Sequence, residues 1–346
     1  MSAKDRLEEL RAKYAGAKGG EVKDPEFKKV SDLLFTGDHR KFPYAGVPTL
    51  LDAPAAPTTA DGPNLDRLDI ALGGVPMDLG VTNRPGARFG PRALRVIERI
   101  GPYNHALKTV PAGSRRIADI GDVPFHSRFD LDRSIQDIED FYTKLHKAGV
   151  IPVSVGGDHS VTYPILKALG RERPVGMVHI DAHCDTAGEF EGAKFHHGGP
   201  FRHAVLDGVL DPERTLQIGL RGSAEFLWEF SYDAGMTVVH AEEIDSFGIE
   251  AVIAKAREVV GDGPTYVSLD VDGIDPAFAP GTGTPEVGGL TPREALQLLR
   301  GLAGLNIIGG DVVEVAPEYD ATTNTVQVGA QMLFEILCLA ALAPKR

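Results

Sequence analysis

Short apolar segments alternate with amphipathic stretches along the chain from about residue 66 onward. Buried parallel strands appear in a sequence as continuous apolar runs, and helices form the crossovers between them. The stretch 131–147 has the spacing of an amphipathic helix that Gly149 closes as its C-terminal cap. Seven strands are expected, at residues 69–75, 150–155, 175–180, 215–220, 237–240, 266–271 and 307–315. This pattern predicts one three-layer α/β domain over residues 67–346.

The first 66 residues lack this alternation. Residues 5–14 carry apolar side chains at helical spacing between charges, which predicts a short surface helix. Residues 35–64 are rich in Pro, Gly and Ala, which favours extended or polyproline geometry. Residues 1–66 are therefore predicted to form a partly extended N-terminal arm rather than a domain.

The composition narrows the classes of partner. The chain has 346 residues and a formal net charge of −13, which repels phosphate backbones and anionic lipid surfaces. Neither nucleic acid nor a membrane is therefore an expected partner, and the longest apolar run, residues 336–343, is too short to span a bilayer. Cys184 and Cys338 provide no disulfide framework, and the charged N-terminus lacks the apolar core of a signal peptide. A cytoplasmic location is expected.

Acidic and imidazole side chains gather in three segments that each follow a predicted strand. The residues are His159, Asp181, His183, Asp185, Asp270 and Asp272. Within the second and third segments they alternate, and side chains two positions apart on extended backbone share one face. Ligands of open α/β sheets bind outside the carboxyl ends of the strands, so we expect the three segments to converge there.

Such a cluster requires cations, because four carboxylates held together would repel one another and raise their own pKa values. Four Asp and two His suit two divalent metal ions, with Mn²⁺ favoured and Ni²⁺, Co²⁺ or Zn²⁺ as alternatives. Two such ions lower the pKa of a shared water and make hydroxide at neutral pH. Hydrolysis is therefore the expected reaction.

Neighbouring polar residues have simpler interpretations. His179 is two positions before Asp181, so on a strand the two side chains share one face. Because His179 lies inside an apolar strand, it is expected to be a packed histidine. Cys184 points away from the ligands by parity and is expected to be buried and inert. Asp158 and Asp275 are expected to fix loop geometry.

The three segments resemble the metal signatures of the ureohydrolase family, which includes arginase and agmatinase. They read Gly-Gly-Asp-His-Ser at 156–160, Asp-Ala-His-Cys-Asp at 181–185 and Ser-Leu-Asp-Val-Asp-Gly-Ile-Asp-Pro at 268–276. Further matches lie at 86–92, 217–222, 281–290 and 311–315, so the similarity covers about residues 66–343. It implies a three-layer α/β/α sandwich on a parallel eight-stranded sheet, of the arginase and deacetylase type.

The resemblance also implies roles for the metal ligands. Asp181 and Asp270 would bridge two Mn²⁺ ions, and the remaining ligands would complete two shells: His159 with Asp185, and His183 with Asp272. A hydroxide held between the ions would attack the guanidinium carbon, and urea would leave together with an amine. Asp185 is thereby counted among the catalytic residues.

The resemblance implies that Glu314 and His197 meet the substrate, and we expect Trp228 in the same pocket. Glu314 corresponds to the carboxylate that binds the guanidinium. His197 corresponds to the histidine that shuttles protons, with His196 as its rival by one position.

The residues near the site disfavour arginine as the substrate. The stretch 187–195 lacks the Asn and Ser side chains with which arginase selects its amino acid. The stretches 35–48 and 226–230 resemble guanidinase-like members of the agmatinase branch, and Phe195 and Phe201 could line a compact pocket. These features favour guanidine, an alkylated guanidine or a biguanide.

Agmatine and guanidinobutyrate remain alternatives. Glu189 or Glu191 could pair with the ammonium of agmatine, whereas an anionic substrate would require a spare Arg, which the sequence does not place. Alternatives of another class are a single-metal amide deacetylase and a non-catalytic subunit of a hetero-oligomer. The resemblance favours a homo-oligomer, and among homo-oligomers it favours a hexamer. A hetero-oligomer with a paralogous subunit remains an alternative.

Overall fold

The computed structural model describes residues 1–16, 22–25, 28, 31–32, 35–36, 39–40, 44–59, 62–97 and 100–345. Contacts divide the chain into two units, Met1–Gly46 and Val47–Arg346. In the first unit, α1 (Ala3–Tyr14) matches the predicted helix, and Ser2 and Asp5 cap it reciprocally. Two short strands, β1 (Phe35–Thr36) and β2 (His39–Arg40), pair in an antiparallel manner.

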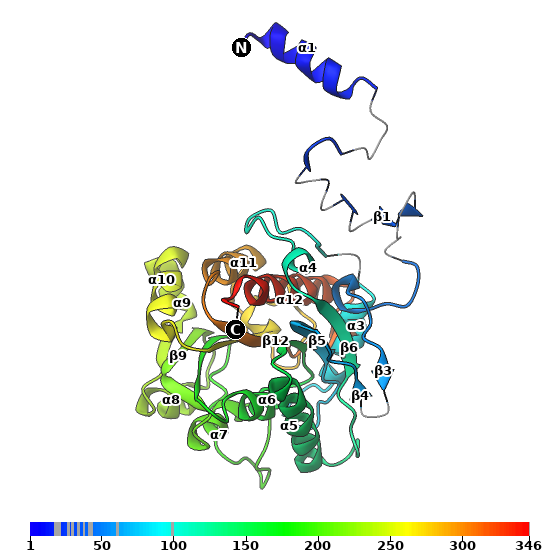
Figure 1. The fold of residues 1–346 in the computed structure, drawn as a ribbon. Coiled ribbons are helices and arrows are strands. Elements are labelled where there is room, and N and C mark those ends of the chain that lie inside the picture. Colours follow the sequence, from blue (N-terminus) through cyan, green and yellow to red (C-terminus); the bar gives the residue numbers. More distant parts are fainter. Residues whose placement is uncertain are drawn as a thin grey trace. The chain divides into compact units, whose positions relative to one another are not determined.

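The second unit is built on an eight-stranded sheet whose order is β10-β9-β8-β11-β12-β7-β5-β6. Every pairing in this sheet is parallel. The strands are β5 (Ile70–Gly74), β6 (Ile117–Asp122), β7 (Ile151–Val155), β8 (Val175–Ile180), β9 (Leu210–Leu220), β10 (Thr237–His240), β11 (Thr265–Asp270) and β12 (Ile307–Val313). The predicted parallel α/β fold is confirmed (Figure 1).

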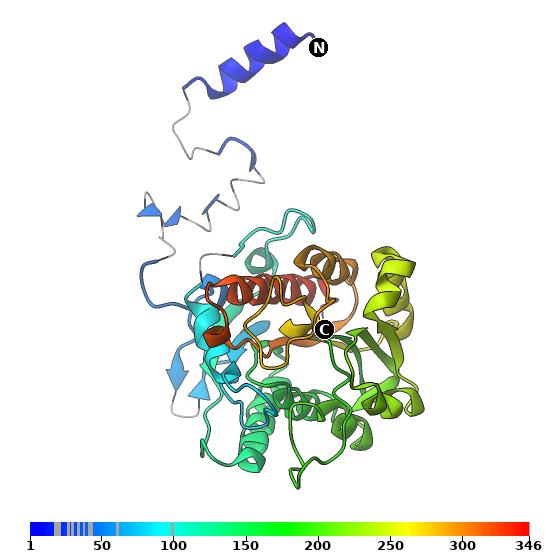
Figure 2. The same cartoon turned by 180° about the vertical axis from the view of Figure 1, so that it is seen from behind.

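Helices cover both faces of the sheet, and each face has its own apolar core. Buried side chains of α10, α11 and α12 belong to one core, and those of α5, α6 and α7 belong to the other. Figures 1 and 2 show the red α12 and the green α5 on opposite sides of the sheet. The helices of this unit are α3 (Gly90–Arg95), α4 (Pro111–Ser114), α5 (Leu131–Lys147), α6 (Thr162–Leu169), α7 (Pro200–Leu206), α8 (Glu229–Asp233), α9 (Ala241–Phe247), α10 (Ile249–Val260), α11 (Pro292–Gly301) and α12 (Asn324–Leu342).

The C-terminal helix α12 is the most apolar of these elements. By length and composition it could cross a membrane, but 78% of its apolar window is buried inside the fold. Its buried carboxylate, Glu335, accepts hydrogen bonds from Arg300 at 2.7 Å and from Asn104 at 2.6 Å. This pairing satisfies the charge in the core, as expected for the central helix of an α/β layer.

The structure differs from the sequence-based expectation in two places. The eighth strand, β6, was absent from the strands expected from the apolar pattern, because Asp119 and Gly121 interrupt its apolar residues. The second place is the described part of the segment before residue 67, residues 47–59 and 62–66, which packs with the sheet although it was predicted to belong to the arm. Leu50 is fully buried, and its N–H donates to the Asp119 carboxylate at 2.9 Å. Two further short strands, β3 (Thr58–Thr59) and β4 (Gly62–Pro63), pair with each other in an antiparallel manner.

Candidate metal centre and active site

The candidate ligands lie at the carboxyl ends of three strands in the middle of the sheet. Asp181 directly follows β8, Asp270 ends β11, and His159 begins a short helical turn, η3 (His159–Val161), after β7. Because all the strands are parallel, these ends meet at one edge of the sheet. The structure therefore brings together six side chains that lie up to 113 positions apart, from residue 159 to residue 272.

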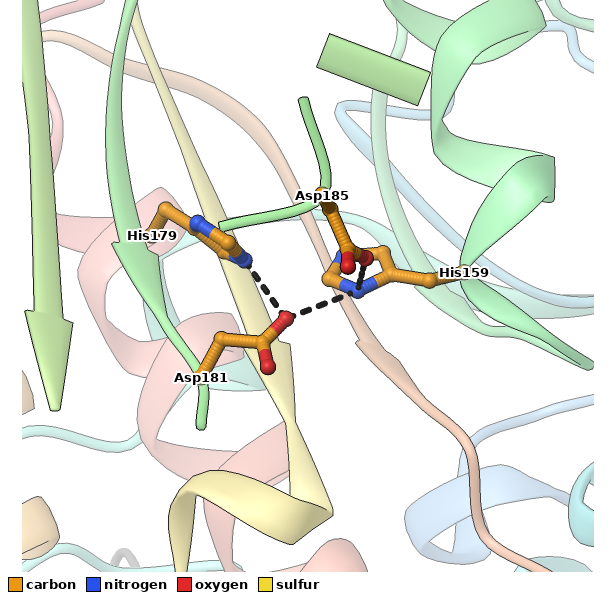
Figure 3. Close-up of side chains that lie close together, drawn as sticks. All are labelled: His159, His179, Asp181 and Asp185. Carbon is orange, nitrogen blue, oxygen red and sulfur yellow. Dashed lines mark hydrogen bonds and ion pairs between the residues drawn. The ribbon is translucent and has the colours of Figure 1, made fainter. Parts of the chain in front are cut away.

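The first group of atoms surrounds Nδ1 of His159. This nitrogen lies 3.1 Å from Oδ2 of Asp181, 2.9 Å from Oδ2 of Asp185 and 3.3 Å from Oδ2 of Asp270. Figure 3 shows the His159 ring directed toward the carboxylates of Asp181 and Asp185. Three carboxylate oxygens and one imidazole nitrogen thus point into one small space.

A second group lies beside it. Nδ1 of His183 is 3.1 Å from Oδ2 of Asp272 and 3.5 Å from Oδ1 of Asp181. The two oxygens of Asp181 therefore face the two groups separately. Such an arrangement allows one carboxylate to hold two cations.

The buried polar atoms fit bound cations. Nδ1 of His159 is buried and lies close to three carboxylate oxygens, but none of these contacts has hydrogen-bond geometry, so the nitrogen has no hydrogen-bond partner among the described residues. Burial and the charge of Asp181 raise the pKa of Asp272 to about 6. Burial and the charges of Asp272 and Asp181 raise the pKa of Asp270 well above its ordinary value. Divalent cations would stabilise the ionised carboxylates, and this mixture of oxygen and imidazole donors suits Mn²⁺ or Ni²⁺.

A hydrogen-bond network holds His159 in the form that can bind a cation. Ser268 Oγ donates to Asp311 at 2.7 Å, and the carboxylate of Asp311 also accepts from Thr162 and Tyr266, each at 2.8 Å. Since the Ser268 proton is used on Asp311, its oxygen accepts from Nε2 of His159 at 2.9 Å. The lone pair of Nδ1 therefore faces the carboxylates.

Glu314 and His197 lie next to this cluster. Glu314 Oε1 accepts the backbone N–H of His159 at 2.9 Å and lies 3.0 Å from Nδ1 of His197. Glu314 Oε2 is buried with no hydrogen-bond partner among the described residues. Burial would lower the pKa of His197, but the charge and hydrogen bond of Glu314 raise it to about 9. Nε2 of His197 lies 2.7 Å from Oγ1 of Thr82.

His196 has a different environment. Its Nε2 lies 2.7 Å from the carbonyl oxygen of Gly188, to which it donates, so the ring braces the loop that follows the ligands. No contact between His196 and Glu314 occurs among the described residues. The geometry therefore favours His197 over His196 as the partner of Glu314.

A hollow of about 300 Å³ opens above these groups. Trp228 lines it, together with Phe190 and with Phe226 of the stretch 226–230 that the sequence singled out. Phe195 and Phe201 do not line it: Phe201 is fully buried against His179 and His159, and Phe195 stacks on Tyr163. Glu189 and Glu191 are exposed and also lie outside the lining.

Cys184 is among the residues that line the hollow, although the sequence suggested that it points away from the ligands, whereas Asp158 and Asp275 lie as expected. Cys184 is buried, its S–H donates to the carbonyl of Leu227 at 3.4 Å, and burial raises the pKa of its thiol. Asp158 accepts the N–H groups of Gly80 and Ser160, at 2.8 and 2.9 Å. Asp275 accepts the N–H groups of Ala277 and Gly288, at 2.8 and 2.7 Å. Both carboxylates thus hold loops.

Arg221 is a pocket residue whose role the sequence did not indicate. It is buried, and its guanidinium donates to carbonyl oxygens of Gly219, Asp272, Glu286 and Val287. All of these partners are backbone atoms, so Arg221 fixes the loop that carries Asp272 instead of offering free donors to a ligand. Its position within the matching segment 217–222 was the only sequence signal.

Comparisons with known proteins agree with this site. The sequence matches the family described as Arginase family over residues 68–339. It is 51% identical to a guanidinopropionase of Pseudomonas aeruginosa over 86% of this chain and 93% of the relative. It is 47% identical to a mitochondrial agmatinase of Gallus gallus (85% and 86% covered) and 45% identical to a guanidinobutyrase of Pseudomonas aeruginosa (86% and 93% covered).

A solved structure has the same fold. Proclavaminate amidino hydrolase from Streptomyces clavuligerus superposes with a TM-score of 0.81 at 37% identity, covering 87% of this chain and 99% of that one. The relatives named in both comparisons act, by their names, on guanidino or amidino groups.

Proposed function

Because the chain belongs to the arginase family, it hydrolyses a C–N bond of a guanidino compound, and we propose that this compound is a linear ω-guanidino acid. The products are urea and an ω-amino acid. The names of the relatives favour the guanidinobutyrase and agmatinase alternatives over guanidine, alkylated guanidines and biguanides, which the sequence had placed first. They also disfavour the amide deacetylase and the non-catalytic subunit.

The observation that carries the catalytic proposal is the unpartnered oxygen of Glu314. Its Oε2 is buried and free of hydrogen bonds among the described residues, and its Oε1 is held by the N–H of His159. A guanidinium presents a fork of N–H donors that matches a carboxylate in charge and geometry. We infer that Glu314 binds the guanidinium next to the six metal-binding side chains.

The six side chains divide between two divalent cations. His159 and Asp185 would hold one, His183 and Asp272 the other, and Asp181 and Asp270 both. When bound, the cations supply hydroxide near neutral pH by lowering the pKa of water.

The other steps belong to the chain's own residues. Glu314 orients the guanidinium so that its carbon faces the cluster. His197 keeps a proton at Nδ1, because the neighbouring Glu314 raises its pKa to about 9. Near neutral pH it can therefore donate this proton to the amine nitrogen that leaves. Phe190, Phe226 and Trp228 give the hollow an apolar wall against which the methylene chain of the substrate can pack.

The charges around the hollow support an anionic substrate. Among the described residues that line it, the carboxylates are Asp185, Asp270 and Asp272, and all three belong to the metal cluster. An ammonium at the far end of the substrate would find no free carboxylate there. Arg202 lines an adjoining hollow that shares Ala187, Phe226 and Leu227 with the first.

Arg202 also has donors to spare. In the described part of the chain, its guanidinium meets only the carbonyl of Thr186, at 3.5 Å, and the ring of Phe230, at 4.7 Å. These free donors support Arg202 as the residue that pairs with the carboxylate of the substrate. Agmatine is the second candidate, because Glu229 and Asp233 line the same adjoining hollow.

A substrate panel tests the proposal. Protein loaded with Mn²⁺ or Ni²⁺ should release urea from guanidinopropionate or guanidinobutyrate with a higher kcat/KM than from agmatine, guanidine or arginine. Arg202→Gln should raise KM for the acids by about tenfold or more and leave KM for methylguanidine unchanged. Arg128→Gln is the matched control, because Arg128 also stacks on a phenylalanine but lies outside the hollow. A preference for agmatine, or an Arg202→Gln variant with unchanged KM for the acids, contradicts the proposed substrate.

The assembly and location stay predictions. We propose a homo-oligomer, most plainly a hexamer, and the alternative is a hetero-oligomer with a paralogous subunit. Light scattering of the purified chain measures the mass of the assembly.

A cytoplasmic location is compatible with two free, buried cysteines. Metal analysis of protein purified without added metal distinguishes Mn²⁺ from Ni²⁺.

A further inference from the structure

A row of buried polar side chains crosses the sheet immediately beneath the metal cluster. Strand register pairs Gln217 with His179, His179 with Ser268, and Ser268 with Asp311. Asp311 pairs in turn with Ser154 on β7. All five side chains are at most 1% exposed. Polar groups at this depth require mutual hydrogen bonds, and the row therefore needs a physical explanation.

Two members of the row are already explained, since Ser268 and Asp311 orient His159. On the other side of Ser268 in the row lies His179, which the sequence suggested to be a packed histidine. Its ring does pack, with its centroid 4.5 Å from that of Phe201 and 5.3 Å from that of His159. Its Nε2 also lies 2.7 Å from Oδ2 of Asp181, the carboxylate that faces both cation groups (Figure 3).

Gln217 determines which nitrogen of His179 carries the proton. Nε2 of Gln217 lies 2.6 Å from the carbonyl oxygen of Cys184, which can only accept a hydrogen bond. The amide must therefore turn its NH₂ group toward Cys184. The second hydrogen of that group points to Nδ1 of His179, 3.0 Å away, so Nδ1 is an acceptor. The proton of the neutral ring then resides on Nε2, facing Asp181.

We propose that His179 is a positioning residue that donates its Nε2–H to Oδ2 of Asp181, and that Gln217 fixes the tautomer that makes this donation. The proposal rests on the proposed two-cation function. It also excludes His179 as a ligand, although His179 lies in one group with His159, Asp181 and Asp185. With its proton on Nε2, the ring offers no lone pair toward the cluster.

The donation has a structural consequence for the cluster. A hydrogen bond to one oxygen restricts rotation of the Asp181 carboxylate about its side chain. Oδ2 then stays near His159 and Oδ1 near His183, at 3.1 and 3.5 Å. Partners that orient a ligand in this way are typically worth about 10- to 100-fold in metal affinity.

Metal affinity tests the proposal without an activity assay. Dissociation constants for Mn²⁺ are measured by competition with a chelator on the full chain, together with ions per chain and the Tm of the metal-free protein. His179→Phe keeps a ring but has no donor, and it should weaken binding of at least one ion by about 10- to 100-fold. His179→Gln retains an N–H donor, so its affinity for Mn²⁺ should fall less than that of His179→Phe.

Gln217→Glu is the sharper variant, because it has nearly the same shape as glutamine. A carboxylate at this place accepts from Nδ1–H of His179, which moves the ring proton away from Nε2. Gln217→Glu should therefore weaken Mn²⁺ binding as His179→Phe does. Gln217→Leu imposes no tautomer on His179, so its Mn²⁺ affinity should fall less. Thr215→Val is the matched control, since Thr215 is fully buried on β9 and its hydroxyl, among the described residues, donates only to the carbonyl of Asp211.

The outcomes separate this proposal from the proposed function. Parent-like Mn²⁺ affinity in both His179→Phe and Gln217→Glu, with two ions per chain, overturns it. If His179→Phe does not fold, the comparison of Gln217→Glu with Gln217→Leu decides, and equal affinities overturn it. A parent that binds two ions but releases urea from no guanidino compound refutes the proposed function, while the affinities still test the role of His179.

Discussion

Two acidic residues of the site, Asp185 and Glu314, have a left-handed backbone conformation that residues other than glycine rarely adopt. The φ angles are +52° for Asp185 and +61° for Glu314. Such a conformation costs roughly 1–3 kcal/mol and persists where surrounding contacts hold it. The N–H of Glu314 donates to Gly157 at 2.9 Å, and its carboxylate accepts from His159. The strain is thus located where the two carboxylates are aimed at the cluster.

Glu314→Gln should separate substrate binding from metal binding. The amide keeps the size of the side chain but loses the charge that pairs with a guanidinium, so kcat/KM should fall by about 100-fold or more. The metal content should stay at the parent value, because Glu314 is outside the six ligands. Steady-state urea release and metal analysis measure the two effects. Glu318→Gln is the control, and a Glu314→Gln variant as active as the parent contradicts the assigned role.

His197→Ala and His196→Ala should have unequal effects. Only His197 contacts Glu314, so its loss should reduce kcat by about 10²–10⁴-fold if it relays a proton. His196 braces the carbonyl of Gly188, so its loss should mainly raise KM. Comparison of kcat for the two variants decides between them. A larger fall in kcat for His196→Ala than for His197→Ala would assign the proton relay to His196 instead of His197.

The residues that sequence reasoning missed share a physical cause. The six ligand candidates follow from spacing within three short segments, because parity along an extended backbone is local. Gln217 meets His179 only through the register of β8 and β9, and Phe190 reaches the pocket through a loop. No local pattern encodes such contacts between distant segments.

At the scale of elements, seven of the eight sheet strands were predictable, including the edge strand β10, and only the other edge strand, β6, was not. Strands such as β7, β8 and β11 are buried along their whole length and are read as apolar runs. β6 lies at the edge, and its last two residues, Gly121 and Asp122, are exposed. Its Asp119 instead receives the N–H of Leu50 and the guanidinium of Arg95, at 2.9 Å each. A strand that is anchored by polar contacts has no distinctive apolar signature.

The edge strand provides a prediction for stability against pH. Asp69, before β5, pairs with Arg116, before β6, at 2.7 Å, and this hydrogen bond lowers the pKa of Asp69 from 3.8 to about 2. Because the folded pKa is lowered, the pair stabilises the folded state above about pH 4, and the contribution is lost as the pH falls toward 2.

Asp69→Asn should therefore lower the midpoint of urea-induced unfolding by the same amount at pH 7 and at pH 5. At pH 3 the difference from the parent should be smaller. Asp66→Asn, on an exposed residue three positions earlier, is the control. A difference between Asp69→Asn and the parent that grows as the pH falls contradicts the sign of this effect.

At the scale of the whole molecule, the catalytic unit begins earlier than its sequence pattern suggested. The apolar alternation starts near residue 66, yet contacts assign residues from Val47 onward to the second unit. The segment is held by one buried leucine and by backbone hydrogen bonds, such as that from Ala56 to the carbonyl of Asp119 at 2.8 Å. A Pro- and Ala-rich stretch can pack in this way without showing any periodicity.

Leu50→Ala tests this boundary. Leu50 is fully buried in the core of α12 and the sheet, and its truncation should cost about 2–5 kcal/mol of unfolding free energy. The exposed Val47→Ala change should cost almost nothing. Urea unfolding of both variants measures the effect, and equal midpoints would place the segment outside the folded unit.

The central claim is that six side chains at one edge of the sheet hold two cations for hydrolysis. Counting metal ions per chain in the parent and in Asp181→Ala, on the same samples that are assayed for urea release, tests it most directly. The account predicts two ions per chain in the active parent, and at most one ion with loss of turnover in Asp181→Ala. An active parent without ions, or a fully active Asp181→Ala variant, would contradict the account.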